Sequence, residues 1–290
     1  RLMMDAGLPS GVINFLPGSG SKITEVALSN SDFAGVHFTG STAVFQGLWQ
    51  RVAEALPNLK GYPRVVGETG GKDFILAHES ADIDTLRTAM VRGAFEYQGQ
   101  KCSAMSRAYL PKNQWDEIRE KLVTEVATID VGPPEDLKNF VNAVIDENAF
   151  DKIASYVDFA NDADDCDVLC GGTYDKSKGY FIQPTVIVTT NPHFKTLEEE
   201  IFGPVLAIQT FRTIDEVIEK ANNTPFGLSA GVWTEKGSKI FKLTKELNAG
   251  VVWANTYNKF DPSSPFGGFK ESGMGREGGL HGLKSYLKFE

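Results

Sequence analysis

The sequence predicts an α/β protein built around a largely parallel sheet, and three observations support this. Short β-rich apolar runs alternate with segments of helical period along the 290 residues, which is the pattern of β–α–β units. No repeat of fixed period is found. With 41% hydrophobic and 23% charged residues, the chain can form a packed core, and its length allows about two domains.

The alternation gives the expected elements in order. Strands are expected at 12–16, 35–38, 64–67, 74–77, 108–111, 168–170, 181–182, 185–188, 205–211, 230–233 and 251–255. Helices are expected at 21–28, 41–56, 83–97, 115–126, 150–159, 214–221 and 238–247, from apolar residues recurring at helical spacing. The Gly-rich tail 267–282 is expected to be loop with at most one helical turn. The rhythm pauses at Gly70-Gly71, so we expect a domain boundary there.

Charge and composition narrow the class of partner. There are 29 Lys and Arg against 38 Asp and Glu, a formal charge of −9, which argues against nucleic acid or an anionic membrane as main partner. A local positive pocket for a nucleotide phosphate stays compatible with this. No apolar run approaches the ~20 residues of a membrane span. Three cysteines predict free thiols in a reducing compartment, and the four scattered histidines predict no metal site.

Two residues are candidates for catalysis. Cys102 lies in a loop with glycine before it and small residues after it, where a thiolate could attack a ligand. Glu68 follows a predicted strand and precedes two glycines, so it faces the crevice at a strand end, where burial raises its pKa and suits a general base. Taken alone, such a cysteine is more often a structural thiol and such a glutamate a solvated loop residue.

Two strand–turn–helix segments are candidate phosphate sites. The segment 38–41 (FTGS) contains Phe38, Gly40 and Ser41, and helix N-terminal amides there could hold a phosphate. Ser41 would equally serve as an ordinary N-cap. The segment 17–20 (PGSG), with Gly18, has the same form but lacks the full G-x-G-x-x-G fingerprint.

A third motif suggests a different chemistry. The segment 227–231 (GLSAG) fits a nucleophile elbow around Ser229, with Asp261 and His281 following in hydrolase order. An elbow needs a strand before the serine, whereas here the predicted strand follows it. A serine hydrolase is therefore a remote alternative, and a non-catalytic binding module leaves the Glu68 and Cys102 loops unexplained.

Taken together, these segments resemble the NAD(P)-dependent aldehyde dehydrogenase superfamily across essentially the whole chain. The matching motifs are 38–41 (FTGS), 68–72 (ETGGK), 99–102 (GQKC), 199–205 (EEIFGPV) and 264–268 (SPFGG). The resemblance implies part of a Rossmann-like NAD-binding domain at 1–69, a catalytic α/β domain at 70–270, and a tail at 271–290 leading to an oligomerisation segment. Family members are longer and this chain starts at Arg1, so we expect an N-terminally truncated fragment.

The resemblance also implies residue roles. Cys102 would attack the aldehyde, with its backbone N–H in the oxyanion hole, and Glu68 would activate the water that hydrolyses the resulting thioester. NAD is the implied cofactor, with NADP not excluded.

Further positions are implied to bind the cofactor or the substrate. Ser41 resembles the residue that meets the pyrophosphate, with Phe38 and Gly40 in the same motif, and Gly18 lies near the adenine. Glu200 resembles the carboxylate that holds the nicotinamide ribose, with Phe202 beside it, and Phe266 resembles the aromatic residue of the substrate tunnel.

Segments in the first two-thirds resemble the branch that oxidises glutamate γ-semialdehyde (1-pyrroline-5-carboxylate) to glutamate in proline catabolism. They are 45–49, 62–74, 92–104, 143–146 and 179–181. Ser103 would then touch the substrate α-carboxylate. The segment 256–264 departs from that branch because it lacks the glycine of the anchor loop. Either Lys259 or Ser263 replaces the anchor, or the protein is a general aldehyde dehydrogenase with another substrate.

The resemblance also extends to partners and compartment. The partner is a small-molecule aldehyde, and the full-length parent is expected to be a homo-oligomer. The compartment is the cytoplasm for a bacterial source or the mitochondrial matrix for a eukaryotic one.

Overall fold

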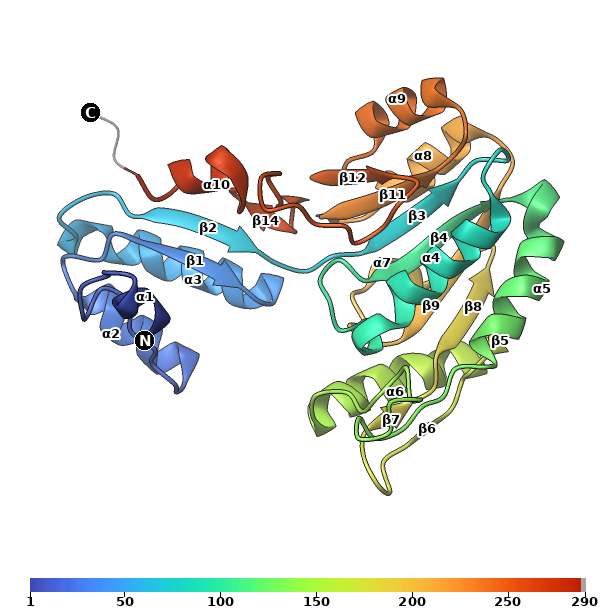
Figure 1. Cartoon of the computed structure of the whole chain (residues 1–290), viewed down its shortest axis with the longest axis horizontal. Coiled ribbons are helices and arrows are strands. Elements are labelled where there is room, and N and C mark those ends of the chain that lie inside the picture. The colour runs from blue at the N-terminus through green and yellow to red at the C-terminus, as the bar shows by residue number, and fades with distance from the viewer. Residues whose placement is uncertain (288–290) are drawn as a thin grey trace.

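The computed structural model describes residues 1–287, and its strands form two main sheets. Figure 1 shows the smaller sheet beside the larger one, with the chain passing between them from β2 to β3. Helices alternate with the strands, so the predicted α/β class is confirmed. The stretch that joins β2 to β3 is residues 69–72, where the sequence predicts a domain boundary.

The smaller sheet has three strands in the order β1-β2-β14. β1 pairs with β2 in parallel, whereas β14 pairs with β2 in antiparallel orientation. Helices α2 and α3 pack together against this sheet through Leu28, Phe45, Leu48 and Val52. The bounds are α1 (Leu2–Asp5), α2 (Gly20–Ser29), β1 (Gly35–Thr39), α3 (Thr42–Ala55), β2 (Arg64–Glu68), β14 (Gly273–Met274) and α10 (Gly279–Lys284).

The larger sheet has seven strands in the order β12-β11-β3-β4-β9-β8-β5, and only β5 is paired antiparallel. The bounds are β3 (Asp73–Ala77), β4 (Met105–Pro111), β5 (Cys166–Cys170), β8 (Thr185–Thr189), β9 (Val205–Phe211), β11 (Ser229–Trp233) and β12 (Val251–Ala254). Two small ribbons pair β6 (Tyr174–Asp175) with β7 (Phe181–Ile182) and β10 (Phe226–Gly227) with β13 (Phe269–Lys270).

Helices cover both faces of the larger sheet. Successive residues of a strand point to opposite faces, so Ile75 packs with α4 and α5 whereas Phe74 and Leu76 pack with α8 and α9. Strand β3 is consequently buried along its whole length, as expected of a parallel strand covered on both faces. The helices are α4 (Ile83–Phe95), α5 (Trp115–Val126), α6 (Glu147–Asp162), α7 (Lys195–Glu198), α8 (Ile214–Asn222) and α9 (Gly237–Glu246).

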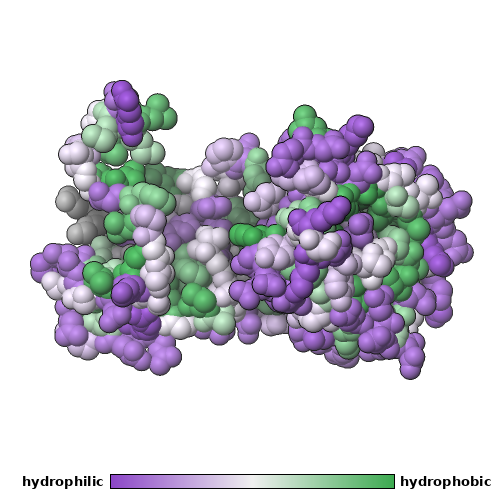
Figure 2. Space-filling model, turned by 90° about the horizontal axis from the view of Figure 1, so that it is seen from below, coloured by the Kyte–Doolittle hydropathy of each residue, from purple (hydrophilic) through white to green (hydrophobic). Residues whose placement is uncertain are grey.

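The strand expected at 12–16 is absent, and these residues are turn and loop. A strand needs a partner for its backbone N–H and C=O groups, and β1 pairs only with β2 among the described strands. The apolar side chains of this segment are exposed, Phe15 by 89%. Figure 2 shows such apolar side chains at the surface of the N-terminal part, on the left.

The tail 267–282, expected to be loop with at most one helical turn, contains the short strands β13 and β14 and the first turn of helix α10. Gly273 of β14 lies so close to β2 that a Cβ atom there would be 1.9 Å from the Gly67 carbonyl oxygen, and its φ is +118°. Only glycine permits both features. Two-residue strands carry no periodic pattern, so the sequence gives no signal for them. Within residues 1–287, no helix combines the length and apolarity needed to cross a membrane.

Candidate active site

Three loops meet at the amino-terminal ends of β3, β4 and β9. The Gly71 backbone N–H donates to the Glu200 carboxylate at 3.0 Å, which ties the loop before β3 to the loop before β9. A Cβ atom on Gly71 would lie 2.3 Å from the Cys102 carbonyl oxygen, so glycine permits the contact with the loop before β4. The structure thus brings Cys102 and Glu200, predicted from separate motifs, to one place.

A second glycine contact joins the Cys102 loop to the Glu200 loop. Gly99 has φ +66°, and a Cβ atom there would be 2.3 Å from the Gly203 carbonyl oxygen. Tyr97 and Gln98 before it also have positive φ, so helix α4 ends at Phe95 instead of continuing to 97 as predicted. This turn places the Cys102 loop against the Glu200 loop.

The Cys102 thiol is partly exposed and surrounded by negative charge. Burial, together with the carboxylates of Asp73, Glu68 and Glu200, raises its pKa to about 11, and the backbone N–H of Ser103 opposes this rise. In this state the thiol is protonated at neutral pH. A nucleophilic role therefore requires a proton acceptor or a nearby positive charge.

Glu68 is the last residue of β2 and only 5% exposed. Burial and the neighbouring Glu277 raise its pKa to about 7, while Arg276 opposes the rise. Its Oε1 atom has no hydrogen-bond partner. A carboxyl group with this pKa is half-ionised at neutral pH, which is the condition for a general base.

Sequence reasoning missed Glu277. The Phe266–Glu277 bridge and the pairing of β14 with β2 carry it to Glu68. Donor atoms of His37, Glu68 and Glu277 all lie within 4.8 Å of one another, an arrangement that the scattered histidines did not suggest. Glu277 acts on Glu68 by raising its pKa, and we assign the cluster no metal.

The predicted phosphate segment lies beside Glu68. The Gly40 N–H donates to the Glu68 carbonyl oxygen at 3.2 Å, and a Cβ atom on Gly40 would lie 2.5 Å from the ring of Phe38. The Ser41 hydroxyl caps α3 by accepting the Val44 N–H at 3.4 Å. The amino end of α3 therefore adjoins Glu68, and the N-cap role of Ser41 is present.

The remaining predicted site residues are placed unequally. Phe202, with φ +62°, is 42% exposed, and Gly18 lies in an exposed loop before α2. Ser103 and Phe266 are buried, with exposed fractions of 3% and 8%. Lys259 lines a separate cavity of 770 Å³ between α4 and the loop 255–259.

A buried charged network lies beneath the Gly70-Gly71 loop, and sequence reasoning missed it. Arg107, 1% exposed, donates from Nε to the Lys72 carbonyl oxygen at 2.8 Å and from a terminal nitrogen to the Tyr109 hydroxyl at 2.9 Å. Burial and the Arg107 charge lower the pKa of Lys72 to about 7. These contacts fix the backbone that carries Gly71.

Ser229 belongs to this network and not to a hydrolase site. Ser229 is the first residue of β11, so the strand follows the serine as predicted, and the residue is 1% exposed. Its backbone N–H and its hydroxyl both donate to the Asp73 carboxylate at 3.0 Å. Asp261 instead accepts from Ser263. The nucleophile elbow suggested by the motif is therefore not formed, which corrects that alternative.

Replacing Ser229 by alanine is expected to lower the free energy of unfolding by about 1–3 kcal/mol, because one buried Asp73 oxygen loses its donor. Urea denaturation measures this. The paired substitution Ser263→Ala, at an exposed site, is the control and should change stability little. A Ser229→Ala protein of unchanged stability would contradict the assigned contact.

Comparisons with known proteins identify a family for the whole chain. The model of the aldehyde dehydrogenase family matches residues 1–290. The delta-1-pyrroline-5-carboxylate dehydrogenase of Dictyostelium discoideum, a mitochondrial protein, is 42% identical over 288 residues, which are 96% of this chain and 52% of that protein. The 1-pyrroline-5-carboxylate dehydrogenase of Bacillus subtilis is 38% identical over 281 residues, 96% of this chain and 54% of that protein.

Solved structures give the same result for the fold. The NAD⁺ complex of an aldehyde dehydrogenase from Bacillus cereus superposes with a TM-score of 0.92 at 32% identity, covering 99% of this chain and 57% of that one. The chain thus spans about half the length of the relatives it matches. With a family model that covers its whole length, the chain belongs to the aldehyde dehydrogenase family.

Proposed function

We propose that this chain carries the catalytic residues for oxidation of glutamate γ-semialdehyde to glutamate, with NAD as cofactor. The observation that carries the proposal is the meeting of the Cys102, Glu68 and Glu200 loops, in which both carboxylates act on the Cys102 thiol. The names of the relatives at 36–42% identity support the substrate.

The residues present fit NAD on two sides of Cys102. The amino end of α3, capped by Ser41, offers backbone N–H groups to a diphosphate. Glu200 is held by the Gly71 N–H and leaves its second carboxylate oxygen for a ribose hydroxyl, with the exposed ring of Phe202 nearby in sequence. When bound, NAD accepts the hydride that oxidation removes from the aldehyde carbon.

The chain's own groups perform the other steps. The Cys102 thiol gives its proton to solvent water and its sulfur attacks the aldehyde carbon, while the Cys102 backbone N–H stabilises the oxygen that becomes negative. Loss of hydride leaves a thioester on the sulfur. Glu68 removes a proton from water, which attacks the thioester carbon, and the carboxylic acid leaves as the thiol reforms.

Ser103 and Phe266 are proposed to contact the substrate, and Lys259 to hold its α-carboxylate. Lys259 lines a cavity with Glu96 and Arg92, and the lining of this cavity does not include Cys102. The second candidate is therefore a general aldehyde dehydrogenase that acts on a different aldehyde. NADP is the alternative cofactor.

The proposed division into 1–69, 70–270 and 271–290 is supported by the change of sheet between β2 and β3. The tail returns to β2 through β14, before any oligomerisation segment that follows. A homo-oligomer in the cytoplasm or mitochondrial matrix completes the proposal.

We expect a kcat/KM for glutamate γ-semialdehyde at least ~10²-fold above that for pentanal, since gripping the amino-acid end contributes about 3 kcal/mol. The assay follows NADH with this chain joined to the part of the Dictyostelium relative outside the matched region. The substitution Lys259→Met removes the proposed partner of the α-carboxylate and should reduce this preference. Equal rates for both aldehydes would favour the general aldehyde dehydrogenase, and no NADH from either would refute the catalytic proposal.

A further inference from the structure

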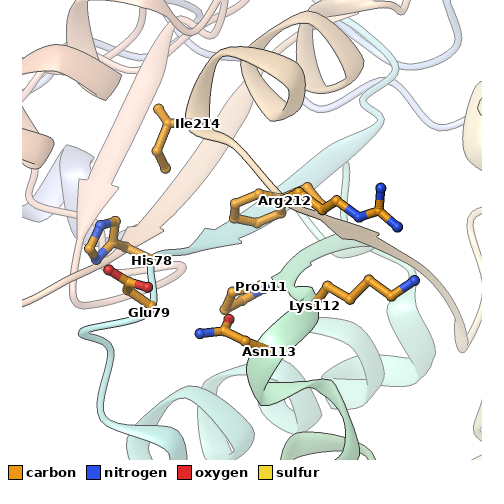
Figure 3. A pocket seen from close by; sticks show the side chains of 8 residues that line it. His78, Glu79, Pro111, Lys112, Asn113, Arg212 and Ile214 are labelled. Carbon is orange, nitrogen blue, oxygen red and sulfur yellow. The ribbon is translucent and has the colours of Figure 1, made fainter.

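A crevice lies at the carboxyl ends of β3, β4 and β9, the sheet edge opposite Cys102. It has a volume of 460 Å³ and is lined by His78 after β3, Lys112 after β4 and Arg212 after β9. Figure 3 shows these side chains arranged around it. Cys102 and Glu200 precede β4 and β9, so the crevice is separate from the candidate active site.

The topology of the sheet marks this position. β4 and β9 are parallel neighbours, but the helices that follow them lie on opposite faces: α5 packs with Ala108 and Leu110, and α8 packs with Tyr109 and Phe211. Such a change of face between adjacent strands is a topological switch point. Open α/β sheets bind ligands in the crevice outside the carboxyl ends at that point.

A second compartment of 350 Å³ adjoins the first and shares Lys112 and Arg212 with it. Its lining includes Gln209, but the Nε2 atom of this side chain is enclosed by protein and does not face the compartment. Lys112 and Arg212 are exposed, so they are the charged donors that a ligand in the compartment can reach.

The charges in this second compartment favour an anion. Lys112 and Arg212 form no ion pair among residues 1–287, although the whole chain has a formal charge of −9. The carboxylate there, Glu216, is already engaged by Lys220 at 2.7 Å and by the Arg212 backbone N–H at 3.0 Å. The two cations Lys112 and Arg212 therefore face the compartment without a carboxylate partner.

The first compartment is less charged. His78, 6% exposed, accepts the Ser80 N–H on Nδ1 at 3.0 Å, so its proton is on Nε2, which can donate. Phe211 and Ile214 supply apolar surface, and Glu79 is the carboxylate of this compartment. This lining suits an uncharged ring with polar edges.

We propose that the two compartments together bind a small organic phosphate. The phosphate lies between Lys112 and Arg212, and the ring lies against Phe211 with the His78 imidazole at its edge. The site is independent of the proposed oxidation.

Isothermal titration of the 290-residue chain with AMP as probe tests this proposal. The double substitution Lys112→Gln/Arg212→Gln is expected to weaken AMP binding at least ~10-fold. The matched control Arg119→Gln/Lys138→Gln removes the same charge at exposed positions and should leave the affinity unchanged. Equal AMP affinity in both double variants would place the anion elsewhere, for example at α3, and overturn the proposal.

Further arms separate the parts of the ligand. Inorganic phosphate should bind more weakly than AMP, and adenosine should not bind. Inorganic phosphate equal to AMP would overturn the assignment of the ring to the His78 compartment, and no binding of AMP up to about 10 mM would overturn the site.

Discussion

The substitution Cys102→Ser is expected to abolish aldehyde oxidation, lowering kcat by roughly 10³-fold or more. A hydroxyl is a far weaker acid than a thiol, and the burial and carboxylates that raise the pKa of Cys102 to about 11 disfavour an alkoxide still more. The measurement is NADH formation by the chimera with the Dictyostelium relative. Cys166 and Cys170 lie on the edge strand β5. The substitutions Cys166→Ser and Cys170→Ser serve as controls and should leave the rate of NADH formation unchanged.

The chain itself allows a test that needs no turnover. In a Cys166→Ser/Cys170→Ser background, alkylation of Cys102 by iodoacetamide should accelerate as pH rises toward about 11, because the thiolate reacts. Glu68→Gln removes a negative charge that raises this pKa, so the profile should move to lower pH. Near-normal NADH formation by Cys102→Ser would mean that another residue is the nucleophile.

Most helices and strands could be predicted from patterns within their own segments. The helix 115–126 and the strand 205–211 have the predicted bounds, because a helical period or an apolar run between turns is complete within the segment. The N-cap Asp82 accepts the Thr85 N–H, and the helix begins at Ile83 as predicted. Asp146 caps α6 in the same way, but that helix begins at Glu147, three residues before the predicted start at 150.

The predictions that were wrong concern segments whose structure depends on residues far away in the sequence. The segment 12–16 has a strand-like composition but no neighbouring strand among residues 1–287. The tail acquires structure only through contacts such as the Thr69 hydroxyl with the Glu271 carbonyl oxygen, 202 residues apart. No periodicity within the tail reports such a contact.

The site shows the same division. Cys102, Glu68 and Glu200 could be predicted because each lies in one of the motifs that resemble the family. The structure shows what two of the glycines in these motifs do: Gly71 and Gly99 occupy positions where a Cβ atom would collide with the opposite loop. Glu277 and Arg107 lie outside those motifs, in the Gly-rich tail and in β4, so their place near the site follows only from the fold.

Glu68→Gln is expected to slow thioester hydrolysis by roughly 10²–10⁴-fold, the usual contribution of a general base, while an initial burst of NADH persists. Stopped-flow measurement of the burst and the steady state separates the two steps. In the unsubstituted protein the hydrolysis rate should rise with pH through about 7, because only the ionised Glu68 accepts a proton. A rate without this pH dependence would contradict the role of Glu68.

Glu277 provides the companion test, since it acts on Glu68 through charge. Its carboxylate raises the pKa of Glu68, so Glu277→Gln should move the midpoint of the hydrolysis profile to lower pH with a similar plateau. Arg276→Gln should move it to higher pH, because the guanidinium opposes the rise. Opposite displacements from neighbouring residues would be expected only if Glu68 itself titrates in the rate. Loss of the plateau in Glu277→Gln would instead mean that Glu277 handles the proton directly.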